Sequence, residues 1–66
     1  MNKLIGVRAE HKVSQEKLAE IIGINKNTYY EKEVGNRDFK LKEVRTIAKY
    51  FNLNAEQIYL IFFKED

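Results

Sequence analysis

Cysteine and proline are absent from the sequence, and glycine occurs only three times, at Gly6, Gly23 and Gly35. Without cysteine, neither a disulfide nor a thiolate metal site can stabilise the chain. Without proline and with little glycine, the chain favours helices joined by short turns. A chain of 66 residues is expected to form one domain, residues 1–66, whose core contributes about 3–5 kcal/mol. Stability must then come from efficient helix packing, from a partner subunit, or from both.

Long apolar segments are also missing. The sequence has no run of about 18 apolar residues, and the charged stretch from Met1 to Val13 lacks the apolar centre of a signal peptide. We therefore expect no membrane association and a cytoplasmic location. Twelve lysines and arginines against ten aspartates and glutamates give a net charge of +2. This charge permits binding to nucleic acid without requiring it.

Apolar residues recur at helical spacing in five segments, and residues that cap helices lie between these segments. Ser14, Asn25 and Asn54 are suited to be N-caps, and Gly23 is suited to end a helix in the left-handed conformation. We expect a compact all-α fold with five helices. Their approximate spans are Asn2–Lys12, Ser14–Ile22, Asn25–Val34, Lys40–Phe51 and a last helix after Asn54 that includes Ile58, Ile61 and Phe62.

The stretch from Gln15 to Tyr30 is the most informative part of the chain. It predicts a short helix, a tight turn at Gly23 and a second helix whose exposed face is polar. Ala19 lies one turn before the glycine and is small enough for two helices to cross closely. This is the layout of a helix-turn-helix, a unit that can place its second helix in the major groove of DNA.

A longer series of residues extends this pattern on both sides. It comprises Arg8, Ser14-Gln15-x-x-Leu18-Ala19, Gly23-Ile24, Thr28-Tyr29, Glu33, Gly35, Leu41-x-x-Val44-x-x-Ile47-Ala48 and Asn54-x-x-x-Ile58. On these residues, the chain resembles the XRE-type, lambda-repressor-like family of helix-turn-helix regulators. The resemblance covers nearly the whole chain. It implies a five-helix DNA-binding domain with the helix-turn-helix at the second and third helices.

The resemblance also implies which residues contact DNA. Positions that read base edges are matched by Lys26, Asn27, Tyr30 and Glu31, and phosphate contacts are expected from Gln15, Asn25, Asn36 and Arg37. Asn27 can bond adenine N6 and N7, and Lys26 can donate to guanine or to a phosphate. Tyr30 can press on a thymine methyl or bond a phosphate, whereas Glu31 can accept from cytosine N4 or orient a neighbouring side chain. The alternative for Tyr30 is a packing residue. The alternative for four others is a solvated surface position: Gln15, Lys26, Asn27 and Glu31.

Four residues are expected to determine how the third helix, the recognition helix, is held on the domain. By resemblance, Arg8 and Glu33 form a structural ion pair between the first helix and the end of the third. At position 32 relatives usually carry an apolar residue, and here Lys32 is expected to lay its aliphatic stem over the core while its ammonium reaches solvent. Tyr29 stands where isoleucine or valine is commoner, so its hydroxyl needs a partner or a route to the surface.

The sequence offers little for catalysis or metal binding. His11 is the only histidine, so a metal site there would need carboxylates alone, and we expect a structural residue at a helix end or core edge. We find no nucleophile–base constellation, phosphate-binding loop or metal-ligand cluster. We therefore expect no enzyme activity, no metal, no cofactor and no small-molecule ligand.

Aromatic residues crowd the C-terminal third of the chain. A domain of this size cannot easily bury Tyr50, Tyr59, Phe62 and Phe63 together. We expect Tyr59, Phe62 and Phe63 to form a homodimer interface. The alternative is an aromatic lid over the domain's own core.

Two hypotheses about function follow. The first is a sequence-specific transcriptional regulator, a repressor of phage or mobile-element type, that binds a palindromic double-stranded operator as a homodimer through its third helix. The second is a protein-interaction module, antitoxin-like or anti-repressor-like, that uses the C-terminal aromatics on another protein and binds DNA only secondarily. A preference for operator over scrambled duplex would distinguish the two.

Overall fold

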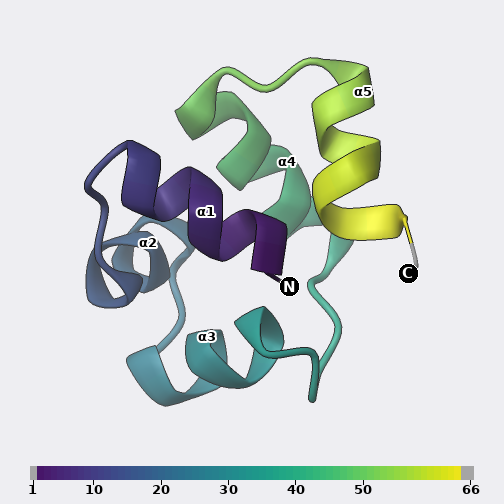
Figure 1. The fold of residues 1–66 in the computed structure, drawn as a ribbon. Helices are drawn as coiled ribbons and strands as arrows, with labels where there is room; N and C mark the ends of the chain where they lie inside the picture. Colours follow the sequence, from purple (N-terminus) through teal and green to yellow (C-terminus); the bar gives the residue numbers. More distant parts are fainter. Residues whose placement is uncertain (1, 65–66) are drawn as a thin grey trace.

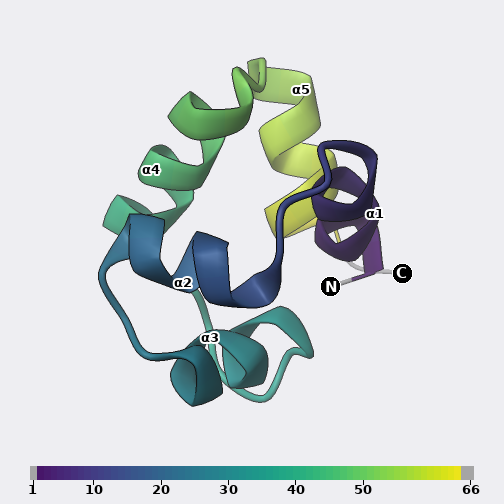
Figure 2. The ribbon, with the colours of Figure 1, turned by 90° about the vertical axis from the view of Figure 1, so that its left-hand side faces the viewer.

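The computed structural model describes residues 2–64, and every regular element within them is helical. Figures 1 and 2 show short helices wrapped around a shared centre, with α3 at the lower edge of both views, away from α5. The expected all-α fold with five helices is confirmed. The elements are α1 (Asn2–Glu10), α2 (Gln15–Ile22), α3 (Lys26–Glu33), α4 (Leu41–Phe51), α5 (Ala55–Ile58) and the π-helical turn η1 (Tyr59–Phe63).

Side-chain caps begin three of the helices at the expected residues. Ser14 Oγ accepts a hydrogen bond from the Lys17 amide at 2.9 Å, at the start of α2. Asn25 Oδ1 accepts from the Thr28 amide at 2.7 Å, at the start of α3. Asn54 begins α5 with a reciprocal capping box in which its side chain and that of a glutamine exchange bonds with backbone amides. These caps satisfy amides that a helix leaves unpaired at its start, so the short helices begin at defined residues.

The ends of two helices differ from the expected positions. α1 ends at Glu10 instead of Lys12, because Lys12 adopts a left-handed conformation with φ of 57° and turns the chain toward α2. The last helix is not uniform, since α5 is followed directly by the wider π-helical turn η1. There the amide of Lys64 bonds the carbonyl of Tyr59 at 2.8 Å, five residues back.

The corner between α2 and α3 follows the sequence expectation. Gly23 has φ of 80°, a left-handed conformation that a residue with a side chain rarely adopts. Its amide and that of Ile24 close the end of α2 by bonding the Glu20 and Ala19 carbonyls. Ala19 is only 2% exposed. The corner therefore fixes the angle at which α3 leaves α2.

The core draws side chains from nearly every element. Its members are Leu4 from α1, Leu18 and Ala19 from α2, Tyr29 from α3, Ile47 and Phe51 from α4, and Ile61 from η1. Tyr29 is the largest fully buried side chain, so its ring holds α3 onto this core. None of the helices within residues 2–64 has the length and apolarity needed to cross a membrane.

Candidate nucleic-acid interface

The recognition helix α3 has a polar outer face and an unusual inner face. Lys26, Asn27 and Tyr30 are exposed, with Tyr30 49% accessible. On the inner side, the buried residues are Tyr29 and two charged residues, Lys32 and Glu33. Because only one apolar side chain of α3 is buried, polar contacts must supply most of the remaining anchoring.

Glu33 is the centre of the first set of polar anchors. Its side chain is fully buried and receives Arg8 in a two-pronged ion pair, from Nε to Oε2 at 2.7 Å and from Nη2 to Oε1 at 3.0 Å. Gln15 Nε2 donates to Oε1 at 2.8 Å, and the Tyr29 hydroxyl donates to Oε2. Arg8 also bonds the Val13 carbonyl at 3.0 Å. The expected Arg8–Glu33 pair is present, and it joins α1, α2 and α3 at one carboxylate.

The surroundings of Glu33 determine its charge. Burial alone would raise the pKa of its carboxyl, but the hydrogen bonds from Arg8, Tyr29 and Gln15 outweigh burial and lower the pKa below its usual value. Burial and the bond to Glu33 raise the pKa of Tyr29, so its phenol keeps its proton and acts as a donor. Glu33 is therefore a carboxylate at neutral pH, and Tyr29 has the hydroxyl partner that its burial requires.

Gln15 is half-buried at the start of α2, beside Glu33. A carboxylate can only accept, so the contact at 2.8 Å orients the Gln15 amide nitrogen toward Glu33. An amide nitrogen carries two protons, so one donor remains for a phosphate. The sequence indicated Gln15 as a phosphate contact but did not predict its bond to Glu33.

The second charged anchor differs from the sequence expectation. Lys32 does not send its ammonium to solvent: Nζ bonds Glu43 Oε1 at 2.6 Å, and the two side chains are only 7% and 8% exposed. Burial alone would raise the pKa of Glu43, but bonds from Lys32 and from the Lys40 amide lower it. The expectation was wrong because α4 presents a carboxylate at the edge of the core, where the ammonium can be neutralised.

The segment after α3 folds back onto this helix. The carbonyl of Glu31 accepts from the amides of Asn36 and Arg37 at 2.9 and 3.2 Å. The side chain of Asn36 also donates to the Glu31 carboxylate at 3.3 Å. Asn36 and Arg37 are exposed next to the end of α3, whereas Glu31 is half-buried. Asn25 is exposed as well, and since its Oδ1 caps α3, only its amide nitrogen can serve a phosphate.

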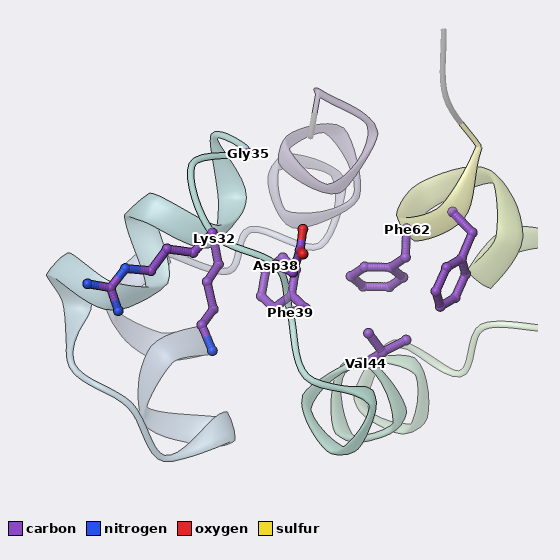
Figure 3. A pocket seen from close by; sticks show the side chains of 8 residues that line it. Lys32, Gly35, Asp38, Phe39, Val44 and Phe62 are labelled. Carbon is purple, nitrogen blue, oxygen red and sulfur yellow. The ribbon is translucent and has the colours of Figure 1, made fainter.

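The C-terminal aromatics are divided between core and surface. Tyr59 and Phe63 are each 54% exposed. Phe62 is half-buried and meets Phe39 edge-to-face, with ring centroids 5.5 Å apart. Figure 3 shows the Phe62 ring pointing toward Phe39. Both residues line a cleft of about 370 Å³. The cleft is lined by Lys32, Gly35, Arg37, Asp38, Phe39, Val44, Phe62 and Phe63.

The side chain of His11 is exposed and lies beside the core residue Phe51. Its Nδ1 is 2.9 Å from the Val7 carbonyl oxygen, and its ring centroid is 4.8 Å from that of Phe51. Within residues 2–64, no group of three or more histidine, cysteine, aspartate or glutamate side chains is arranged to hold a metal ion. The contacts of His11 are those of a packing residue.

The corner at Gly23, the anchored α3 and its exposed polar face define a helix-turn-helix DNA-binding domain. A family model described as a helix-turn-helix domain, of the XRE type, matches residues 2–61, and the chain belongs to this family. The identification made from the sequence is thus confirmed.

Two curated proteins are similar to the chain. An uncharacterized HTH-type transcriptional regulator of Methanocaldococcus jannaschii is 39% identical over 59 residues, covering 89% of each chain. The cryptic phage CTXphi transcriptional repressor RstR of Vibrio cholerae is 36% identical over 57 residues. That match covers 86% of this chain, which spans about half the length of RstR, 51%. No solved structure gives a significant match.

Proposed function

We propose that the protein is a sequence-specific transcriptional repressor that binds a palindromic operator as a homodimer. The two copies of α3 would enter successive major grooves about 34 Å apart. The main support for this proposal is the polar outer face of α3, where Lys26, Asn27 and Tyr30 are exposed. The opposite side of this helix is hydrogen-bonded to α1, α2 and α4. The names of the two relatives support regulation of transcription, and one of them is a phage repressor.

Base recognition is assigned to the outer face of α3. Asn27 has the donor and acceptor that adenine requires, and Lys26 has the donor that guanine requires. Tyr30 offers a ring for a thymine methyl. Glu31 serves best as an orienting residue, because its carboxylate already holds Asn36.

Phosphate contacts are assigned to residues around this face. Gln15 and Asn25 lie at the starts of α2 and α3, where the positive end of the helix dipole favours an anion. Asn36 and Arg37 reach from the turn after α3. Bound there, the protein would repress by occluding the polymerase. A cytoplasmic location is part of the same proposal, since the operator DNA would lie there.

The decisive experiment is selection of bound duplexes from a random pool. It yields the site, its symmetry and the half-site spacing together. The expected result is a palindrome with half-sites about one helical turn apart. Equal affinity for the selected duplex and a scrambled one would contradict the proposal. It would favour the antitoxin-like or anti-repressor-like alternative, in which the exposed Tyr59 and Phe63 contact another protein.

Replacing Asn27 by alanine should relax the preference at one operator position. Loss of a bidentate base contact costs about 1–3 kcal/mol of discrimination, so affinities for duplexes that vary at that position should converge. Competition titrations with the four base-pair variants measure this. Arg37→Ala is the matched control: it should weaken all duplexes alike and lower the salt dependence by about one charge. A uniform loss from Asn27→Ala would contradict its assignment as a base reader.

The homodimer interface is assigned to Tyr59, Phe62 and Phe63, and Phe63 offers the clearest test. Phe62 packs on Phe39, so its loss would also disturb the fold, whereas Phe63 is exposed. Phe63→Ser should shift the protein from dimer to monomer in sedimentation at tens of micromolar. Leu41→Ser, at an apolar position that is 67% exposed, is the control and should leave the dimer intact. An unchanged dimer in Phe63→Ser would overturn this interface.

A further inference from the structure

We infer that Lys32 and Glu43 are a positioning pair for DNA binding: they hold the segment between α3 and α4 so that Arg37 meets the DNA backbone. This inference rests on the proposed function and extends it to two residues that do not themselves face the DNA. Lys32 is in the last turn of α3, and Glu43 is in the first turn of α4. The segment that carries Asn36 and Arg37 runs between these two turns.

One oxygen of Glu43 joins both ends of this segment. Oε1 accepts from Lys32 Nζ at 2.6 Å and from the Lys40 amide at 2.9 Å. The first bond holds the end of the recognition helix, and the second caps the start of α4. The carboxylate therefore fixes the distance and direction between the two helices that the segment must connect.

The segment has two other restraints. The Glu31 carbonyl accepts from the amides of Asn36 and Arg37, and the Phe39 ring contacts those of Tyr29 and Phe62, with centroids 6.0 and 5.5 Å apart. The side chains of Asn36, Arg37 and Asp38 are exposed, and Gly35 has φ of 94°. Figure 3 shows Lys32 and Asp38 on one side of the cleft that the segment borders.

The physical character of the pair suits positioning more than stability. Two charges in a site that is 7% and 8% exposed lose hydration on folding, and apolar residues of similar volume often give equal or greater stability. Because Glu43 Oε1 accepts from both Lys32 Nζ and the Lys40 amide, the pair holds the end of α3 and the start of α4 in a defined relative orientation. Because Glu43 neutralises the Lys32 ammonium, we do not assign Lys32 as a phosphate contact.

The test is a double-mutant cycle between the pair and Arg37. The pair is made neutral by Lys32→Met with Glu43→Gln, because glutamine at 43 keeps an oxygen for the Lys40 amide. Affinity for the duplex selected by the wild-type protein is measured in four proteins: wild type, the neutral pair, Arg37→Ala, and both changes combined. Circular dichroism and thermal unfolding establish that each is folded at the assay temperature. If this variant does not fold, Lys32→Gln with Glu43→Gln replaces it, because this neutral pair leaves no unpaired buried charge and can still form a hydrogen bond.

If the pair acts through the segment, neutralising it should cost roughly three- to thirty-fold in affinity, and this loss should largely vanish once Arg37 is alanine. An equal loss in both backgrounds, or no loss at all, overturns the inference. Amide hydrogen exchange of the free protein adds a readout without DNA: Asn36 to Lys40 should exchange faster in the neutral pair, with α5 unchanged. Wild-type protein that binds no duplex overturns the proposed function, whereas binding without coupling overturns only the positioning role.

Discussion

Replacing Glu33 by glutamine is expected to destabilise the fold by about 3–5 kcal/mol, because it leaves the Arg8 charge without its partner in a site with little access to water. The Arg8 side chain is 14% exposed and that of Glu33 is fully buried. The carboxylate accepts four hydrogen bonds, from Arg8 twice, Gln15 and Tyr29. Glutamine offers one acceptor oxygen, and its amide nitrogen would face donors.

This loss is comparable with the whole stability of a domain of this size, about 3–5 kcal/mol. The variant should therefore be largely unfolded near room temperature in dilute solution, and urea titration followed by circular dichroism measures the change. Glu20→Gln is the matched control. Glu20 pairs with Lys17 at 3.3 Å, but the side chains are 76% and 56% exposed, so its loss should cost well under about 1 kcal/mol. Equal urea midpoints for Glu33→Gln and wild type would contradict the central role of this carboxylate.

The sequence predicted the local features of the fold well. The caps at Ser14, Asn25 and Asn54 and the left-handed Gly23 were predictable because each depends on residues close together in the chain. The Arg8–Glu33 pair was also expected, although its partners are 25 residues apart. It came from the resemblance to a family and not from spacing.

The polar contacts of Lys32 and Gln15 were not predictable from spacing. Lys32 and Glu43 lie 11 residues apart on different helices, and Gln15 and Glu33 lie 18 apart. No helical periodicity brings such residues together, because their approach depends on how the helices cross. The sequence pattern therefore predicts a solvated ammonium for Lys32, whereas the fold provides a carboxylate as its partner. The π-helical turn over Tyr59–Phe63 likewise has no sequence signal, since its apolar spacing resembles that of an ordinary helix.

Acid is expected to unfold the protein through two buried carboxylates, Glu33 and Glu43. Burial by itself would raise the pKa of each, but donated hydrogen bonds lower both below the ordinary glutamate value of 4.5. A carboxyl whose pKa is lower in the folded state stabilises the fold fully above its unfolded pKa. That contribution is lost as pH falls through the folded pKa, because the unfolded chain takes up protons first.

Above about pH 5, these two carboxyls should therefore leave the unfolding temperature unchanged. Below about pH 4.5, they should make it fall steeply. Between its folded and unfolded pKa, each carboxyl lowers the free energy of unfolding by up to about 1.4 kcal/mol for each unit that the pH falls. Thermal unfolding by circular dichroism between pH 7 and pH 2 measures the slope. Glu43→Gln combined with Lys32→Met, which leaves no unpaired buried charge, should remove the part of the slope that Glu43 causes, whereas Glu20→Gln should keep the wild-type slope. If the protein with both changes kept the full wild-type acid dependence, the bonds from Lys32 and the Lys40 amide would not hold the Glu43 carboxyl ionised. The acid sensitivity would then belong to Glu33 alone.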